Sequence, residues 1–413
     1  MARKVIILGA GCAGTMVANK LRHALGQHEW SITVIDRDAD HIYQPGLLFV
    51  PFGIYQASDV RRPRSEFLGE GIDLVIDRVR KVDPKNQRVE TEKGTFAYDK
   101  LVVSTGVDLA PEEIEGMSEG WQRVVFDFYT LPGAENLARA LREFDEGRIV
   151  LDVAEVPYKC PVAPMEFVYL LDWYFAQRGI RDKVQIELVT PLSTCLNFPI
   201  AGTYLTGLAH AKNIDTTFDF TLESVDCKTR TIRSFKGDIV SFDLLVSIPP
   251  NVGAKALIDS GIADADGLVK TNKHTLKAMH FDNMWVVGDT ADLPTSKAGS
   301  VAHFSAEVLV ENFIREINDL PLKPDYDGHS NCFIDTGFGK ASLIDFNYEV
   351  EPLPGKFPLP GFGPFTLVGE SRTNHWGKMM FKWVYWNLLL TGKKLPIAPQ
   401  MSMAGKVRNR SAH

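Results

Sequence analysis

Three glycines near the N-terminus occur at the spacing that binds a dinucleotide. The segment Gly9-Ala10-Gly11-Cys12-Ala13-Gly14 follows an apolar run at residues 5–8. In such a motif the first glycine makes a tight turn, the second lets backbone approach a pyrophosphate, and the third lets a helix pack closely on a strand. The helix that follows would direct its unpaired N–H groups at the phosphates. Asp36 ends a second apolar run, where a carboxylate accepts ribose hydroxyls. We therefore predict a dinucleotide-binding βαβ unit.

The five cysteines are Cys12, Cys160, Cys195, Cys227 and Cys332. The first strand is expected to begin at Lys4 or Val5, which leaves no room for a signal peptide, so we expect a cytoplasmic environment. There, a cysteine pair is more often catalytic or redox-active than structural. The sequence has no CxxC or HxxxH pair, and its ten histidines are scattered, so no metal site is expected.

A second βαβ unit is predicted from a helix at residues 133–144, strands at 148–153 and 184–190, and a helix at 164–177. In a nicotinamide-binding domain, a glycine-rich loop would follow the first of these strands. Residues 152–164 contain no glycine and carry Cys160 instead. We infer that this domain does not bind NAD(P)H.

Later segments return to the first domain. A strand at residues 283–287 ends in Gly288 and Asp289, and Lys297-Ala298-Gly299 precedes a helix at 300–317. Small residues Ser104, Thr105 and Gly106 end another buried strand, where the chain could cross over a cofactor. The predicted fold class is α/β, with a dinucleotide-binding domain at 1–110 and 281–345 and a second Rossmann-like domain at 111–280.

The remaining region, 346–413, differs in composition. Residues 374–394 combine tryptophans, methionines and leucines with lysines, and the apolar run within them is too short to span a bilayer. Such a helix can lie in the membrane interface with its amines among headgroups. The alternatives are a helix docked on the protein's own core and a dimer interface.

The residue composition and the net charge of the chain limit the classes of partner that it is expected to bind. The chain has 413 residues, of which 45% are hydrophobic and 23% charged, as in a globular protein of two or three domains. A formal net charge of −7 argues against nucleic acid as the main partner.

Several of these motifs together resemble the sulfide:quinone oxidoreductases. The resemblance includes the glycine motif, His41-Ile42-Tyr43-Gln44-Pro45, the loop from Lys159 to Pro164, and the hairpin that begins Cys332-Phe333-Ile334. It covers nearly the whole chain and implies a two-domain flavoprotein that oxidises hydrogen sulfide to polysulfide or sulfur. It also implies FAD as cofactor, membrane quinone as acceptor, peripheral attachment to a prokaryotic cell membrane, and a homo-oligomer.

The resemblance also implies roles for individual residues. Cys160 would be the thiolate that attacks the flavin and Cys332 the persulfide carrier, while Glu166 is a candidate proton acceptor near Cys160. The residues expected to contact FAD are Gly9, Gly11, Cys12, Ala13, Gly14, Asp36, Arg37, Gln44, Pro45, Ser104, Thr105, Gly106, Gly288, Asp289, Lys297, Ala298 and Gly299. The quinone candidates are Phe338, Phe362 and Lys382, and Lys297 and Lys382 are weaker candidates for polarising flavin or quinone oxygens.

The chain differs in one feature from many bacterial sulfide:quinone oxidoreductases. Those proteins carry a third cysteine upstream of the first of the pair. Residues 121–129 contain none, so the place where the sulfur chain grows is open. Three other functions stay as alternatives: a type II NADH:quinone oxidoreductase-like enzyme, a flavocytochrome c sulfide dehydrogenase flavin subunit, and a redox-sensing flavoprotein without turnover.

Overall fold

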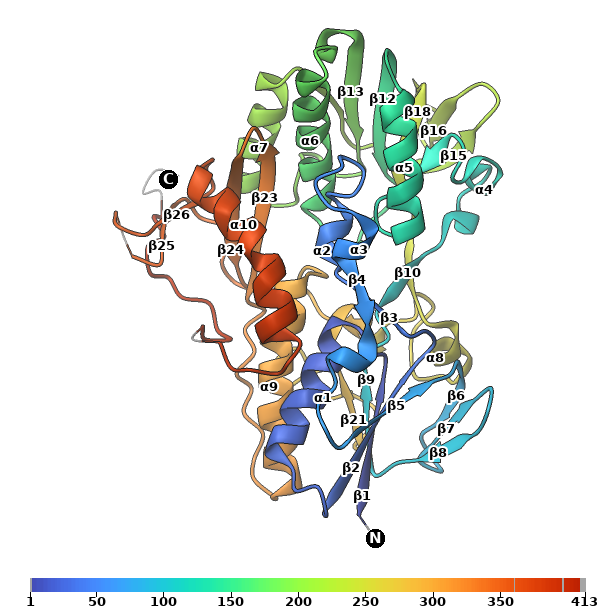
Figure 1. Ribbon diagram of the computed structural model, residues 1–413, viewed down its shortest axis with the longest axis vertical. Coiled ribbons are helices and arrows are strands. Elements are labelled where there is room, and N and C mark those ends of the chain that lie inside the picture. The colour runs from blue at the N-terminus through green and yellow to red at the C-terminus, as the bar shows by residue number, and fades with distance from the viewer. Residues whose placement is uncertain (1, 360, 396, 409–413) are drawn as a thin grey trace.

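The first domain is built on a parallel sheet that joins two distant parts of the chain (Figure 1). The computed structural model describes residues 2–359, 361–395 and 397–408. The strand order is β21-β9-β1-β2-β5, and all neighbouring strands are parallel. The bounds are Arg3–Leu8 for β1, Trp30–Asp36 for β2, Ile72–Ile76 for β5, Lys100–Val103 for β9 and Met284–Val286 for β21. The predicted return of the chain to its first domain is thus observed as the pairing of β21 with β9.

Two helices cover this sheet. α1 (Cys12–Ala24) and α9 (Gly299–Ile317) pack against each other and lie side by side in Figure 1. Their apolar residues, including Val17, Leu21, Leu309 and Phe313, share one core with Trp285 of β21. The position of α1, the helix that follows the glycine motif, is therefore fixed by its packing against α9, which comes from the later segment of the chain.

The second domain contains another five-stranded parallel sheet, in the order β11-β18-β12-β13-β14. Its strands are β11 (Val125–Phe126), β12 (Gly147–Val153), β13 (Val184–Val189), β14 (Ile214–Thr217) and β18 (Leu244–Ile248). Three helices share a core with one face, namely α5 (Leu131–Glu143), α6 (Ala163–Gln177) and α7 (Pro199–Ala211). The small sheet of β15 (Leu222–Asp226), β16 (Thr231–Ser234) and β17 (Ile239–Ser241) packs on the other face. The α/β fold class predicted from the sequence is confirmed.

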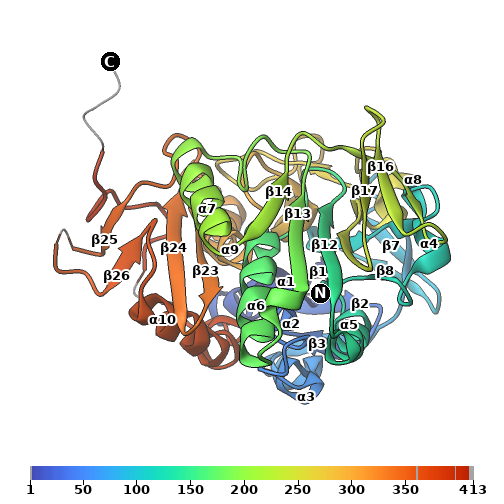
Figure 2. The same ribbon diagram turned by 90° about the horizontal axis from the view of Figure 1, so that it is seen from above.

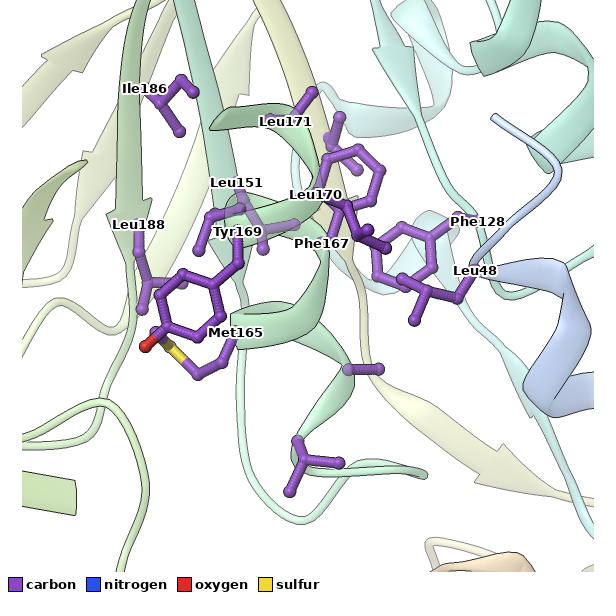
Figure 3. Packing of buried hydrophobic residues seen from close by; sticks show 14 of the residues in the cluster. Leu48, Phe128, Leu151, Met165, Phe167, Tyr169, Leu170, Leu171, Ile186 and Leu188 are labelled. Carbon is purple, nitrogen blue, oxygen red and sulfur yellow. The ribbon is translucent and has the colours of Figure 1, made fainter. Parts of the chain in front are cut away.

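The core around α6 joins the two domains (Figure 3). Leu170 and Leu171 belong to the same core as Leu151 of β12. Phe167 stacks on Phe128, with ring centroids 4.5 Å apart. Leu48, from the first chain segment, packs into this same cluster. The core of the second domain therefore includes residues of the first domain here, which fixes the helix that carries Glu166 relative to the first domain.

Two short strands mark the crossings between the domains. β10 (Val107–Leu109) pairs antiparallel with β19 (Asn251–Gly253). The other short elements are α2 (Gln44–Leu47), α3 (Ala57–Val60), α4 (Met117–Gly120), α8 (Lys255–Asp259), β3 (Asp40–Ile42), β4 (Arg61–Pro63), β6 (Val79–Asp83), β7 (Arg88–Thr91), β8 (Thr95–Ala97), β20 (Val269–Lys270) and β22 (Ala291–Asp292).

The C-terminal region forms a third layer beside both domains (Figures 1 and 2). Its sheet has the order β23-β24-β26-β25, with bounds Ser330–Gly337, Lys340–Phe346, Phe365–Leu367 and Gly355–Phe357. α10 (Arg372–Val384) packs on this sheet and continues into a π-helical turn at Tyr385–Leu389. Ile334 and Ile344 of the hairpin join the core around α6. Cys332 is thereby carried on a hairpin that contacts the second domain.

Residues 72–83 form two strands, β5 and β6, because Asp77 accepts hydrogen bonds from the backbone N–H groups of Arg78 and Lys93 and turns the chain. The helix expected over 374–394 ends near Leu390, whose carbonyl accepts a bond from Asn19. Gly392 then turns with φ +73°. Among the described residues, no helix is long and apolar enough to cross a bilayer.

Candidate active site

The three glycines form the cradle that their spacing predicted. Gly9, between β1 and α1, has φ +95°, and a Cβ there would lie 2.4 Å from the carbonyl oxygen of Ser104. A Cβ on Gly14 would lie 1.9 Å from the carbonyl oxygen of Gly9, so helix and strand meet too closely for a side chain. Nothing lies within 4 Å of a Cβ built on Gly11. That open space over the start of α1 fits backbone approach by a pyrophosphate.

The acid at the end of β2 is held at this cradle. Asp36 accepts a hydrogen bond from the backbone N–H of Ala10 at 2.6 Å. Arg64 lies 3.3 Å from the Asp36 carboxylate and also donates to the carbonyl of Ala10. Arg37 pairs instead with Asp108 at 2.5 Å. Arg64 is a candidate cofactor residue that the sequence reasoning missed, since it is far from the motif in sequence and reaches it only through the pairing of β3 with β4.

The C-terminal region also touches the glycine motif. Tyr385 lies near the thiol of Cys12 and opposes the burial that raises the pKa of that thiol to about 12. His41 lies 2.7 Å from the Tyr385 hydroxyl through Nε2 and 3.2 Å from the Ala10 carbonyl through Nδ1. Gln44 and Pro45 begin α2 just beyond this contact. The conformation of the turn therefore depends on a residue more than three hundred positions away.

The other predicted cofactor residues surround the same edge of the sheet. A Cβ on Gly288 would lie 3.2 Å from the Cβ of Ala13, so the turn after β21 abuts the start of α1. Thr105 contacts Thr290 at 3.1 Å between hydroxyls. Lys297 donates to the carbonyl of Asp289 at 2.6 Å, and burial raises the pKa of the Asp289 carboxyl. The structure brings these predicted cofactor residues together: Gly9, Gly14, Ala13, Ser104, Thr105, Gly288, Asp289, Lys297 and Gly299.

The two cysteines of the expected redox pair lie within electrostatic range of each other, and Cys160 is held next to the start of α9. The backbone N–H of Cys160 donates to the carbonyl of Lys297 at 2.7 Å, two residues before that helix. Cys332, on β23, lies close enough for its negative charge to raise the pKa of the Cys160 thiol, although burial is the larger cause. Cys160 has φ +53°, a left-handed conformation that costs a non-glycine residue about 1–3 kcal/mol. Such strain is characteristic of residues held for function.

A buried ion pair adjoins both thiols. Glu166, in the first turn of α6, pairs with Lys378 of α10, and their side chains are 3% and 12% exposed. Glu166 also accepts a hydrogen bond from the backbone N–H of Asp335 at 2.7 Å. Burial raises the pKa of Glu166 to about 7, against the opposing effect of Lys378. Burial lowers the pKa of Lys378, but Glu166 and Asp335 outweigh it and raise that pKa above its usual value.

Lys378, which pairs with Glu166, is a site residue that the sequence reasoning did not name. Lys382 lies one helical turn further along α10 and pairs with Asp59 at 2.8 Å. Phe338 lies at the tip of the β23–β24 hairpin, where the amine of Lys212 sits 4.8 Å from its ring centroid. Phe362 is 90% exposed. The three proposed quinone residues therefore occupy separate places, and their role stays a prediction.

The other cysteines lie apart from this pair. Cys195 is buried in the core of the second domain, and Cys227 follows β15 in a turn. Within the described ranges, no group of three His, Cys, Asp or Glu side chains could hold a metal ion.

The chain is similar in sequence and in structure to known proteins. Residues 3–150 match the family model described as pyridine nucleotide-disulphide oxidoreductase. The mitochondrial sulfide:quinone oxidoreductase of Dictyostelium discoideum is 29% identical over 400 residues, which are 94% of this chain and 86% of that protein. The crystal structure of the sulfide:quinone oxidoreductase of Aquifex aeolicus superimposes with a TM-score of 0.80 at 20% identity, covering 95% of this chain and 92% of that one.

The resemblance to the sulfide:quinone oxidoreductases is confirmed. The chain is an oxidoreductase similar to these enzymes, and its fold is that of the Aquifex aeolicus sulfide:quinone oxidoreductase. By contrast, the type II NADH:quinone oxidoreductase of Staphylococcus epidermidis is 32% identical over only 118 residues, or 28% of this chain and 29% of that protein. Since the Dictyostelium discoideum relative is mitochondrial, the expected prokaryotic origin of this chain stays a prediction.

Proposed function

We propose that the chain binds FAD and oxidises hydrogen sulfide to polysulfide or sulfur through Cys160 and Cys332, with membrane quinone as electron acceptor. The observation that carries the proposal is the placement of both thiols within electrostatic range of the buried Glu166–Lys378 pair, with the backbone of Cys160 bonded to Lys297 just before α9. The glycine cradle at the start of α1 supports the dinucleotide half of FAD.

The sulfur chemistry follows from the pair. HS⁻ attacks the Cys332 sulfur of a bridge with Cys160, so that a new S–S bond forms on Cys332. The old S–S bond breaks, and its electron pair leaves with Cys160 as a thiolate. Bound flavin would supply the acceptor for two electrons and relay them to quinone. Lys378 faces both sulfurs and opposes the effect of burial on the pKa of each thiol.

The first test is an anaerobic titration of the purified yellow protein. Sulfide is expected to bleach the flavin absorbance, and a short-chain quinone is expected to restore it. NADH is expected to leave the absorbance unchanged, because residues 152–164 contain no glycine to admit a pyrophosphate. Bleaching by NADH would favour the type II NADH:quinone oxidoreductase-like alternative. A flavin that neither donor reduces would favour the redox sensor.

An exposed apolar face supports attachment to a membrane. Trp376, Met380 and Trp383 follow each other at four and three residues along α10 and are 70%, 62% and 60% exposed. The opposite face of the helix carries Asn374 and Lys378 into the protein. An amphipathic helix of this kind can lie in the lipid interface, which distinguishes this chain from a flavocytochrome c subunit that docks on a cytochrome. We also expect a homo-oligomer, which light scattering on the detergent-free protein would check.

A glycine substitution tests the cofactor site. Gly11→Ala is expected to reduce the flavin content of the purified protein by about tenfold or more, because the methyl group would occupy the space that a pyrophosphate needs. The measurement is the ratio of flavin to protein absorbance. Gly207→Ala, on a helix with equal space around the added Cβ, should leave that ratio unchanged. Full flavin content in Gly11→Ala would contradict the assigned pyrophosphate position.

The pH dependence tests Glu166. Its carboxylate can accept a proton only above its pKa, so the rate of flavin reduction by sulfide should rise as pH increases through about 7. Glu166→Gln should lower this rate by about 10²–10⁴-fold at high pH and much less at low pH. Because sulfide itself ionises, the measurement is the ratio of wild-type to variant rates at each pH. A ratio that does not change with pH would argue against proton transfer by Glu166.

A further inference from the structure

The charge of the chain is distributed unevenly along its length. Residues 346–413, which include α10, contain nine Lys and Arg but only three Asp and Glu. The preceding 345 residues contain 36 Lys and Arg and 49 Asp and Glu. A chain with a net charge of −7 therefore carries a cationic C-terminal region on an anionic body. Such a distribution orients a protein in the field of a charged partner.

Several cations of this region have partners within the protein. The ion pairs are Lys378–Glu166, Lys382–Asp59 and Lys406–Asp345. The amine of Lys356 donates to the hydroxyl of Thr366 at 2.8 Å. These side chains stabilise the fold of the C-terminal region, so its attraction for an external partner depends on the other cations.

Three other cations flank the apolar face of α10 at its two ends. Arg372 is the first residue of α10 and precedes Trp376 by four residues, so both lie on the same face of the helix. Lys393 and Lys394 follow Gly392, where the chain turns after the π-helical segment. All three side chains are exposed, and within the described ranges none of them has an ion pair or a side-chain hydrogen bond.

A fourth cation lies at the C-terminal end of the same helix. The guanidinium carbon of Arg62, on β4, is 5.0 Å from the ring centroid of Trp386 in the π-helical turn. Arg62 is itself exposed. Glu66 is exposed next to Phe67, which stacks on the same tryptophan, and offsets one of these charges. The apolar face thus has a net cationic border.

We propose that this border binds the phosphates of anionic phospholipids while Trp376, Met380 and Trp383 enter the acyl boundary. The inference rests on the membrane contact of the proposed function and specifies the class of lipid. Long Lys and Arg side chains can lay their stems along apolar surface and keep their charges among headgroups. An anionic bilayer attracts each exposed cation near its surface and repels the anionic body, which orients α10 toward the lipid.

The same charges disfavour a second copy of the chain as the occupant of this face. In a two-fold symmetric dimer, each subunit would contribute the same surface patch. Arg372, Lys393 and Lys394 of one subunit would then come close to those of the other, and juxtaposed like charges are unfavourable.

Partitioning of the intact protein into two kinds of vesicle tests the proposal. One kind is phosphatidylcholine alone, and the other contains about one-quarter phosphatidylserine, which supplies the anionic headgroups. The wild-type protein is expected to bind the anionic vesicles about tenfold or more tightly, because several exposed cations each add attraction. High salt should remove this difference and retain binding to phosphatidylcholine, since ions screen exposed charges. Co-sedimentation at two ionic strengths is the measurement.

A charge-neutral variant and its matched control locate the effect. Arg372→Gln/Lys393→Gln/Lys394→Gln should lose the preference for anionic vesicles but bind phosphatidylcholine like the wild type, which would show that the apolar face is intact. Lys81→Gln/Lys85→Gln/Arg88→Gln removes the same charge from the exposed β6–β7 hairpin, across the molecule from α10 in Figure 1, and should keep the preference. An equal loss in both variants would mean that only net charge matters and would overturn the proposal.

Two other results would overturn the inference in distinguishable ways. Equal binding of the wild type to both kinds of vesicle would exclude recognition of anionic lipid and leave attachment through the apolar face intact. Binding to neither would exclude membrane attachment itself. In that case, a dimer that Trp376→Gln/Met380→Gln/Trp383→Gln dissociates in light scattering would identify a second copy as the occupant of the face.

Discussion

Replacing Cys160 or Cys332 by serine is expected to abolish sulfide-dependent quinone reduction almost completely. Each variant should lose about a hundredfold or more in turnover, because a serine cannot form the S–S bonds through which sulfide would be oxidised. Both should still bind FAD, since Gly9, Gly11 and Gly14 lie between β1 and α1 and not on the segments that carry the two cysteines. The measurements are the steady-state rate with a short-chain quinone and the flavin absorbance of the purified variants.

The two variants should fail at different points of the reaction. If Cys332 carries the persulfide, Cys332→Ser should acquire no sulfide-derived sulfur, whereas Cys160→Ser should lose the thiolate that passes on the electrons. Cys227→Ser is the control, because Cys227 lies in a turn after β15, outside the pair. Wild-type turnover in either active-site variant would exclude the cysteine mechanism, whatever the overall reaction proves to be.

The parts of this site that the sequence predicted are those that one local segment encodes. The glycine motif gives its own turn, because Gly9 and Gly14 have positions that exclude a side chain. The loop that carries Cys160 contains no glycine, and our inference that it binds no second dinucleotide stays a prediction. Asp36 was predicted as the end of β2, and the structure holds it at the backbone of Ala10.

The parts that could not be predicted depend on packing between distant segments. Lys378 and Lys382 are four residues apart on one helix, so sequence periodicity places them on the same face. Only the docking of α10 against the hairpin decides that Lys378 reaches Glu166 and Lys382 reaches Asp59. The position of Tyr385 near Cys12 and that of Arg64 beside Asp36 likewise require the folded C-terminal layer and the β3–β4 pair.

The second large expected effect concerns binding of the exposed face of α10 to a membrane. Changing Trp376, Met380 and Trp383 together to glutamine should reduce partitioning into phosphatidylcholine vesicles by about a hundredfold or more, because three large apolar side chains no longer enter the interface. Glutamine keeps the helix propensity of α10 and adds no charge, so the fold and the electrostatics should be unaffected. Vesicle co-sedimentation is the measurement.

A matched control has the same number of exposed apolar side chains on other surfaces. Phe235, Ile239 and Met279 are 70%, 57% and 58% exposed and lie outside the C-terminal layer, so their replacement by glutamine should leave vesicle binding unchanged. If both triple variants lost binding equally, adsorption would be non-specific and the α10 face would have no special role.

Measuring the reduction of two different quinones then separates the effect of membrane binding from the effect on the reaction at the active site. The α10 variant should reduce a water-soluble short-chain quinone at the wild-type rate, since Glu166, Lys378 and both cysteines are retained. Its rate with a long-chain quinone dissolved in vesicles should fall in parallel with membrane binding, because that quinone can be reached only from the bilayer. Loss of both activities would mean that the exposed tryptophans support the active site itself. Retention of both would mean that quinone reaches the flavin by a route that does not involve this face.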